Sequence, residues 1–151
     1  MILTLDTIGL FIFLAGFVIG QGAVTVIDLH GFLGRKSAYW TEATIRTHKV
    51  TKPLIWLGMI LAIVGGSILY RALPLSGIPL IHACLAVVRV LNGCFLSFVV
   101  SPYLLKQERE GKSRELLPAS LQMKITGSFV ISFLGWWSAL FLLAYYLISV
   151  R

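Results

Sequence analysis

The chain alternates long apolar segments with shorter polar segments that hold nearly all of its charged residues. A bilayer core about 30 Å thick requires roughly 20 apolar residues in a helix. Four segments meet this requirement, namely residues 8–27, 53–70, 78–105 and 125–150. They predict an all-α, polytopic membrane protein with a four-transmembrane-helix bundle. We expect residues 1–151 to form a single integral membrane domain.

The polar segment between the first two spans has the pattern of a helix. Ser37 can cap its start, and Glu42 stands four residues before Arg46, which is the favourable order for an ion pair on a helix. Its apolar side would consist of Tyr39, Trp40, Ala43 and Val50. We therefore predict a short amphipathic helix in the headgroup plane. Pro53 then starts the second span.

The composition agrees with a protein that resides in lipid. Hydrophobic residues make up 58% of the chain and charged residues only 13%, whereas soluble domains carry about 25% charged residues. The residues before the first span contain an acid and no Lys or Arg, so we expect a retained helix and not a cleaved signal peptide. Cys84 and Cys94 would lie about 15 Å apart on one helix, too far for a disulfide.

The net charge of +7 is distributed unevenly between the two sides of the predicted membrane. Most Lys and Arg residues fall in two loops, residues 29–52 and 106–122, while the opposite side carries Arg71 and Arg151. The positive-inside rule then places both long loops in the cytoplasm and both termini outside, in the cell (inner) membrane. This distribution accounts for the basic excess, so we predict the lipid bilayer as a partner and no nucleic acid.

Small residues recur at helical spacing on three of the four spans. In lipid, such residues allow helices to approach closely and therefore mark packing faces. The residues concerned are Gly9, Gly16 and Gly20 on the first span, Gly58 and Gly65 on the second, and Ser128, Ser132 and Gly135 on the fourth. They predict either a tight bundle or a surface for a homo-oligomer or a membrane protein partner.

One face of the third span is polar, because His82, Arg89 and Asn92 stand at i, i+7 and i+10. A charge in the middle of a membrane costs several kcal/mol and is therefore paired, turned inward or hydrated. Arg89 has two interpretations. It could bond Gln21, Asn92 and backbone carbonyls and so fix the packing. Alternatively, it could bind an anionic ligand, such as a carboxylate or propionate, or line an ion path.

Trp136 and Trp137 stand near the centre of the fourth span. Adjacent helical residues point about 100° apart, so at most one of the two indoles can face the interior of the bundle squarely. That indole could be a bulky filler opposite the glycines. It could also be an aromatic wall for a flat ligand.

A second group of polar residues lies near the end of the first span. Gln21, Thr25 and Asp28 form a stripe along it, and the following loop is expected to bring His30 and His48 close to Asp28. Histidines with a carboxylate can form a metal site or a proton relay. A histidine at a helix C-terminus is also favoured by the helix dipole alone.

The four spans, the polar loop and the run of residues 51–58 resemble a group of small four-helix membrane proteins. The group includes the bacterial membrane protoporphyrinogen oxidase family, the copper-resistance D-type membrane domains and uncharacterised integral membrane relatives. The segment Leu-Ile-His-Ala-Cys-Leu at residues 80–85 is similar to an H-A-K-L stretch in the third helix of the oxidases, with Cys84 in place of the lysine. The resemblance implies a bundle that holds haem or a porphyrin, with His82 as the haem-iron ligand.

These features support three hypotheses of function. The first is a haem b or porphyrin protein for electron transfer or tetrapyrrole oxidation; its binding residues would be His82, Arg89, Asn92, Trp136 and Trp137. The second is a non-catalytic subunit or scaffold that packs against a partner membrane protein. The third is a small transporter or channel. No nucleophile–base pair, phosphate-binding loop or zinc motif is evident in the sequence, so no catalytic residue is predicted.

Overall fold

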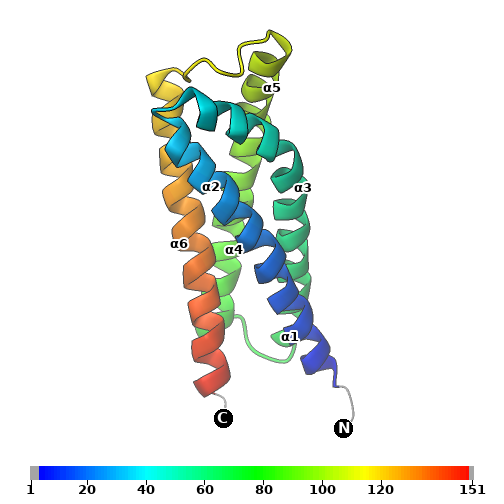
Figure 1. Cartoon of the computed structure of the whole chain (residues 1–151). Coiled ribbons are helices and arrows are strands. Elements are labelled where there is room, and N and C mark those ends of the chain that lie inside the picture. Colours follow the sequence, from blue (N-terminus) through cyan, green and yellow to red (C-terminus); the bar gives the residue numbers. More distant parts are fainter. Residues whose placement is uncertain (1–3, 150–151) are drawn as a thin grey trace.

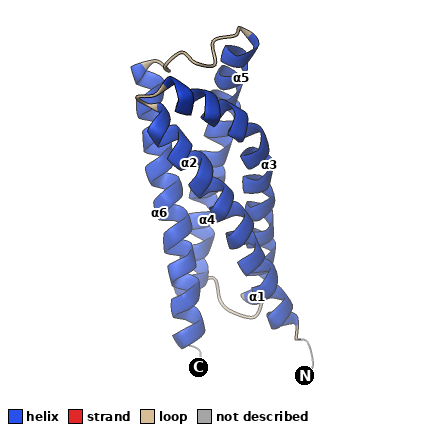
Figure 2. Cartoon of the chain, viewed as in Figure 1, coloured by secondary structure: helices blue, strands red, loops and turns tan. Residues whose placement is uncertain are grey.

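A computed structural model of the chain describes residues 4–149. Within that range every regular element is a helix, and four long helices run along one another as a bundle (Figures 1 and 2). The four are Leu5–Gly34, Ala38–Leu69, Gly77–Arg109 and Ala119–Ser149, each long and apolar enough to cross a membrane. The predicted fold class is thereby confirmed, and the chain is a small multi-pass membrane protein.

Two of the long helices contain one π-helical turn, and the other two have none. The first is built from α1 (Leu5–Gly16), a π turn (Phe17–Gln21) and α2 (Gly22–Gly34). The third is built from α4 (Gly77–Phe95), a π turn (Leu96–Val100) and α5 (Ser101–Arg109). The uninterrupted helices are α3 (Ala38–Leu69) and α6 (Ala119–Ser149). Each helix begins before its predicted span, and α3 ends at Leu69, one residue before the predicted end. Val150, the last residue of the fourth span, lies outside the described residues.

The polar segment after the first span is helical as predicted, but it does not end before Pro53. Instead α3 continues through Pro53, and its first turns cross the end of the bundle before the helix runs alongside the others (Figure 1). The expected apolar side is not the buried one, because Tyr39 and Val50 are exposed while Thr44 and Ile45 are buried. Threonine tolerates this burial because its hydroxyl bonds its own helix, as Thr44 Oγ1 does with the carbonyl of Trp40 at 2.7 Å.

Ion pairs join the two basic loops at one end of the bundle, which we call the loop end. The predicted pair of Glu42 and Arg46 is present at 2.6 Å. Glu42 also contacts Arg114 of the second loop at 2.7 Å, and Lys49 contacts Glu108 at 2.8 Å. The opposite end, which we call the terminal end, holds the first turn of α1, the turn between α3 and α4, and the last turn of α6 (Figure 1).

Glycines bring the backbones of α1 and α3 into direct contact. A methyl group on Gly16 would lie 2.5 Å from the backbone nitrogen of Ala62, and one on Gly58 would lie 2.3 Å from the Cα atom of Gly20. A methyl group on Gly65 would lie 2.3 Å from the backbone nitrogen of Phe13. The glycine seams predicted from the sequence are therefore packing faces within the bundle.

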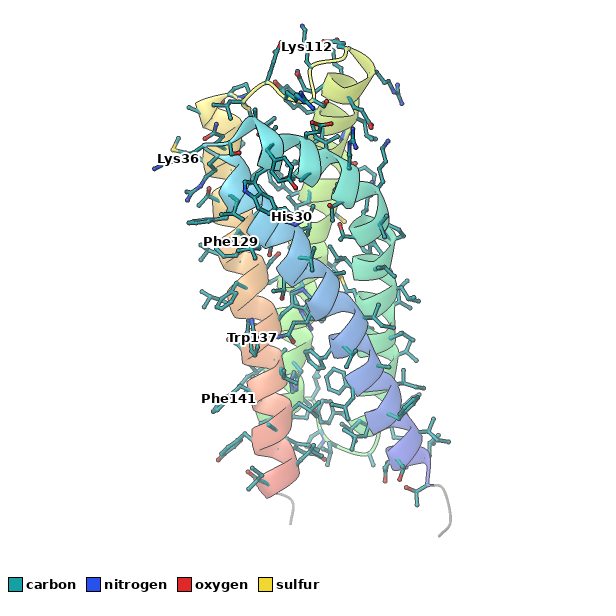
Figure 3. The ribbon with its side chains drawn as sticks, viewed as in Figure 1. His30, Lys36, Lys112, Phe129, Trp137 and Phe141 are labelled. Atoms are coloured by element: carbon teal, nitrogen blue, oxygen red, sulfur yellow. The ribbon has the colours of Figure 1, made fainter. Side chains whose placement is uncertain are left out.

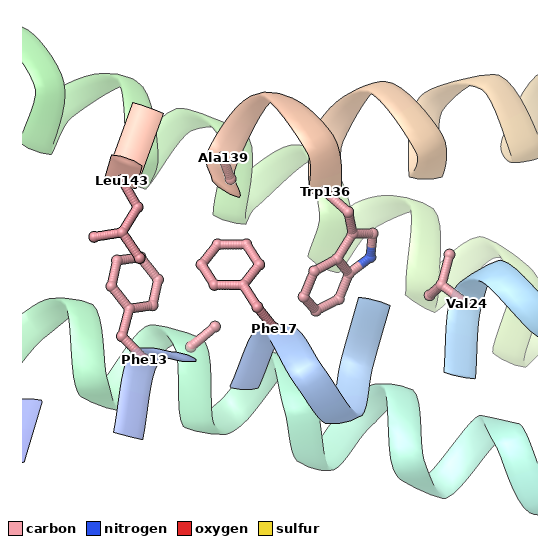
Figure 4. Close-up of a cluster of buried hydrophobic side chains, with 7 residues drawn as sticks. Phe13, Phe17, Val24, Trp136, Ala139 and Leu143 are labelled. Atoms are coloured by element: carbon pink, nitrogen blue, oxygen red, sulfur yellow. The ribbon is translucent and has the colours of Figure 1, made fainter. Parts of the chain in front are cut away.

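The aromatic core lies where the first long helix, around its π turn, meets α6. Phe13 and Phe17 of the first helix interdigitate with Trp136, Ala139 and Leu143 of α6 (Figure 4). The first long helix thus packs against both α3 and α6, and α4 packs mainly against α6. Contacts between α4 and α3 are sparse although the two helices are consecutive. This arrangement leaves room between α3 and α4.

Candidate functional site

His82 is held in one orientation by two hydrogen bonds. Its Nε2 atom lies 2.8 Å from the carbonyl oxygen of Ala139, and its Nδ1 atom lies 2.9 Å from the hydroxyl of Tyr70. A carbonyl oxygen can only accept, so Nε2 carries a proton, and in the neutral imidazole Nδ1 then accepts from the Tyr70 hydroxyl. The imidazole also stacks on the Tyr70 ring, with centroids 5.5 Å apart. The side chain is only 6% exposed.

Arg89 lies inside the bundle with one nitrogen unpartnered. The residue is 4% exposed, and its Nε donates to the carbonyl of Leu85 at 3.2 Å. The guanidinium carbon lies 4.6 Å from the centroid of the Trp136 ring, which is a cation–π contact. The buried nitrogen Nη1 has no hydrogen-bond partner within residues 4–149. Arg89 is therefore held by one backbone hydrogen bond and by the Trp136 ring, and some of its N–H groups form no hydrogen bond.

The packing interpretation of Arg89 accounts for only part of this arrangement. The expected bond to a backbone carbonyl is present, whereas bonds from Arg89 to Gln21 and Asn92 are not among the contacts within residues 4–149. The Oε1 atom of Gln21 is buried and also lacks a partner. Asn92 instead donates to the Ser132 hydroxyl at 2.9 Å and accepts from the Ser128 hydroxyl at 2.8 Å. Asn92 therefore joins α4 to α6.

A cavity of about 580 Å³ lies between α3 and α4, next to these residues. Its polar side chains are Ser67, Tyr70, His82 and Arg89. The rest of the lining is apolar and includes Phe13 of α1. Ile63, Val87 and Leu91 line the cavity and are also exposed on the outside of α3 and α4. The cavity therefore opens sideways, towards the surface that meets lipid chains.

The two tryptophans have separate environments, as the helical geometry requires. Trp136 is 2% exposed and packs against Gly20, where a methyl group would come within 2.4 Å of the indole. Trp137 is 47% exposed and projects from the outer side of α6, as does Phe141 (Figure 3). Trp136 thus fills the space that the glycine leaves, and its ring also supports Arg89. Trp137 does not belong to the site.

The histidines expected at the loop end lie apart from this cavity. Asp28 and His48 both line a second, smaller cavity. His30 packs its ring against Trp40, with centroids 5.1 Å apart, and its Nδ1 atom is buried without a partner. In the part of the chain that the structure describes, no group of three His, Cys, Asp or Glu residues is placed to hold a metal ion.

The arrangement of His82 does not fit a haem-iron ligand. A haem ligand must offer the lone pair of one ring nitrogen to the iron. Here Nε2 carries the proton that bonds Ala139, and the lone pair of Nδ1 accepts from Tyr70. Ligation would require Tyr70 to leave its stacked position. Binding of haem or a porphyrin itself stays a prediction.

Tyr70 is a member of the site that the sequence analysis missed. It occupies the C-cap of α3, twelve residues before His82, and no motif connects the two. The short turn between α3 and α4 is the one signal that could have found it, because a short connection forces the last turn of one helix beside the first turns of the next. The carbonyl of Ala139 could not be predicted as a partner of His82, because every residue has a backbone carbonyl.

No protein-family model, curated protein or solved structure matches the chain. The resemblance to the protoporphyrinogen oxidase and copper-resistance D-type group therefore stays a prediction.

Proposed function

We propose that the protein binds a lipid-soluble molecule with an anionic head, such as a carboxylate, in the cavity between α3 and α4. The observation that carries this proposal is the guanidinium group of Arg89 in the wall of a mostly apolar cavity, with its Nε bond to Leu85 as its one hydrogen bond within residues 4–149. A buried donor without a partner is costly, more so when it is charged. An anionic ligand in the cavity would offset this cost by balancing the charge of the guanidinium group.

The chemistry of arginine favours this class of ligand. A guanidinium presents paired donors that match a carboxylate or phosphate in two parallel bonds. Because Trp136 and Gly135 pack on the side chain, the head group of Arg89 is held in place before the ligand binds. Contacts of this kind lower the entropy lost on binding.

The apolar lining and the sideways opening indicate that the ligand, apart from its anionic head, is apolar and lipid-soluble. A molecule that dissolves in the bilayer can enter between α3 and α4 without crossing water, and its hydrocarbon part would contact Phe13, Ala86 and Val90. A porphyrin with propionate groups belongs to this class, and so does a fatty acid. Ligation of an iron by His82 is not part of the proposal.

The test compares acids with their esters on the purified protein in lipid nanodiscs. cis-Parinaric acid and protoporphyrin IX serve as fluorescent probes, each against its methyl ester, which has the same apolar body without the charge. We expect the acids to bind at least tenfold more tightly than the esters, which corresponds to about 1.4 kcal/mol or more. In Arg89→Met this preference should disappear, and Arg89→Lys should retain part of it.

A matched control is Trp137→Leu, since Trp137 faces away from the cavity. It should bind both probes as the wild type does. Circular dichroism and thermal unfolding of each variant would check that the helices are intact. Equal binding of acid and ester by the wild type, or an unchanged preference in a folded Arg89→Met protein, would overturn the proposal.

We propose the orientation given by the positive-inside rule, with both long loops in the cytoplasm. Support comes from the Lys and Arg residues gathered at the loop end, while at the terminal end Arg71 is paired with Asp6. The test starts from a protein in which Cys84 and Cys94 are replaced by alanine. A membrane-impermeant maleimide should label Leu75→Cys in intact cells, and Glu115→Cys only after permeabilisation. The reverse pattern would refute this orientation.

A further inference from the structure

A second cavity of about 80 Å³ lies at the loop end, enclosed by α2, α3, the π turn after α4 and α6. It is distinct from the cavity that Arg89 lines. Asp28 projects into it from α2, and His48 and Lys52 from α3. Ser97 of the π turn and Thr126 and Ser128 of α6 add hydroxyl groups. The walls between them include the rings of Trp56 and Phe129.

Asp28 is an acid without a protein partner. Four other acids form ion pairs at the ends of the bundle: Asp6, Glu42, Glu108 and Glu110. Glu115 is exposed on a loop. Asp28 is half-buried on a transmembrane helix, and no ion pair or hydrogen bond of its carboxyl group occurs within the described range 4–149. A carboxyl group at such a place must be protonated or hydrated.

The basic groups in the cavity do not approach Asp28 directly. His48 Nε2 lies 2.8 Å from the hydroxyl of Ser101, and Lys52 Nζ lies 3.4 Å from the same hydroxyl. Neither forms an ion pair with Asp28, so more than 4 Å separates the charged atoms. The cavity thus places an acid on α2 across an open space from a cation and an imidazole on α3.

This space is large enough for several water molecules. A cavity must offer at least about 10–15 Å³ to hold one water, and that water needs two to four polar partners. A volume of about 80 Å³ is therefore enough for a few waters. The waters could form hydrogen bonds with the carboxyl group of Asp28, the ammonium group of Lys52 and the hydroxyl groups that line the cavity.

We propose that this cavity is a hydrated proton-binding site, in which Asp28 exchanges a proton with water that enters from the loop end. On binding, a hydronium ion transfers a proton to a carboxylate oxygen of Asp28 and becomes water; on release, the carboxyl group gives the proton to a water molecule, which leaves as hydronium. His48 and Lys52 are the other titratable groups among the lining residues. The π turn and α6 present hydroxyl groups and apolar side chains, and α4 and α5 present only Gly93 and Leu104.

The site touches the hydrogen bonds that hold α4 to α6. Ser128 lines the cavity, and its hydroxyl donates to Asn92 at 2.8 Å. Asn92 stands one helical turn from Arg89 on α4. The proton site at the loop end is therefore connected, through two side chains, to the helix that carries Arg89.

A metal cation is the main competing occupant, and the charges in the cavity disfavour it. Asp28 is the single acid of the lining, and Lys52 contributes a positive charge to the same space. A sodium ion prefers several oxygen ligands with net negative charge. A cation site would be recognised by its response to sodium, which would compete with modification of Asp28.

The experiment uses dicyclohexylcarbodiimide, an apolar reagent that modifies protonated carboxyl groups, on the full-length protein in nanodiscs. Adducts are mapped by mass spectrometry at pH values from 5 to 9. We expect an adduct on Asp28 whose yield falls at least fivefold as the pH rises over this range. Glu115 serves as an internal control, because an exposed acid should react with a water-soluble carbodiimide instead.

Two variants sharpen the result. Asp28→Asn should lose the adduct, which confirms the assignment. Lys52→Met should increase the yield at a given pH, because removing the neighbouring cation favours the protonated carboxyl group. The absence of an Asp28 adduct at every pH, or a yield that does not change with pH, would overturn the proposal. Suppression of the adduct by sodium at constant pH would also overturn it, in favour of a cation site. The wild-type measurement decides even where a variant does not fold.

Discussion

The two sides of α3 show how the same helix can form a tight contact and a cavity. Towards α1, Gly58 and Gly65 allow backbone to meet backbone, with no room for a methyl group. Towards α4, the side chains of Ala62, Ile63 and Ser67 line an open space of about 580 Å³. In lipid, apolar side chains gain little by leaving the hydrocarbon, so close approach depends on small residues facing each other. The α3–α4 side lacks such a seam.

The same difference between a tight contact and an open space is seen at two consecutive glycines of α3, Gly65 and Gly66. A methyl group on Gly65 would lie 2.3 Å from the backbone nitrogen of Phe13, but one on Gly66 would lie 3.6 Å from the edge of the Phe13 ring. The first distance is a clash with backbone and the second is an ordinary contact. Gly65 is therefore required by packing, whereas Gly66 borders the cavity.

The largest effect is expected for Gly65→Ala. The added methyl group would force α1 and α3 apart, and such overpacking costs about 1–3 kcal/mol. We expect a lower Tm in nanodiscs or detergent, measured by circular dichroism. Gly66→Ala is the matched control, and its Tm should be unchanged or slightly higher, since alanine favours helix by about 0.5–1 kcal/mol over glycine.

Equal Tm values for the two variants would show that the contact between α1 and α3 is not as close as described. Gly22→Ala offers a second reference, because a methyl group there meets nothing within 4 Å. It should behave as Gly66→Ala does.

A smaller effect on stability, with a large effect on binding, is expected for Ala86→Phe. Ala86 lines the cavity from α4, so the phenyl ring can enter empty space. We expect the free energy of unfolding to change by less than about 1.5 kcal/mol, as for tolerated core substitutions, so the Tm should shift only slightly. Binding of protoporphyrin IX should weaken at least tenfold. Ala144→Phe, on an exposed position of α6, should alter neither. A large loss of stability in Ala86→Phe alone would mean that the cavity is closed.

Much of the fold could be predicted because it depends on local pattern. The lengths of the apolar segments predicted four helices, and the spacing of the small residues predicted that Gly16, Gly58 and Gly65 would lie at contacts. The geometry of a helix required that only one of Trp136 and Trp137 could be buried. Arg89 was expected to turn inward because a charge is costly in hydrocarbon.

The partners within the site could not be predicted, because they come from different helices. Tyr70 reaches His82 across the turn between α3 and α4, and Ala139 reaches it from α6. Asp28 was expected near both histidines, yet it shares a cavity with His48 while His30 packs on Trp40. The rotation of each helix about its axis decides such pairs, and spacing along one helix does not fix the rotation of its neighbour.

The sequence by itself determined that this chain crosses a membrane four times and that Arg89 is a charge within the bilayer span. These properties follow from transfer free energies, which each residue contributes wherever its neighbours lie. Only the tertiary structure decided that α3 packs closely on α1 and sparsely on α4, which leaves the cavity beside Arg89 and commits both nitrogens of His82. Cavities and hydrogen bonds depend on the fit between surfaces of separate helices, and that fit exists only once the bundle has assembled.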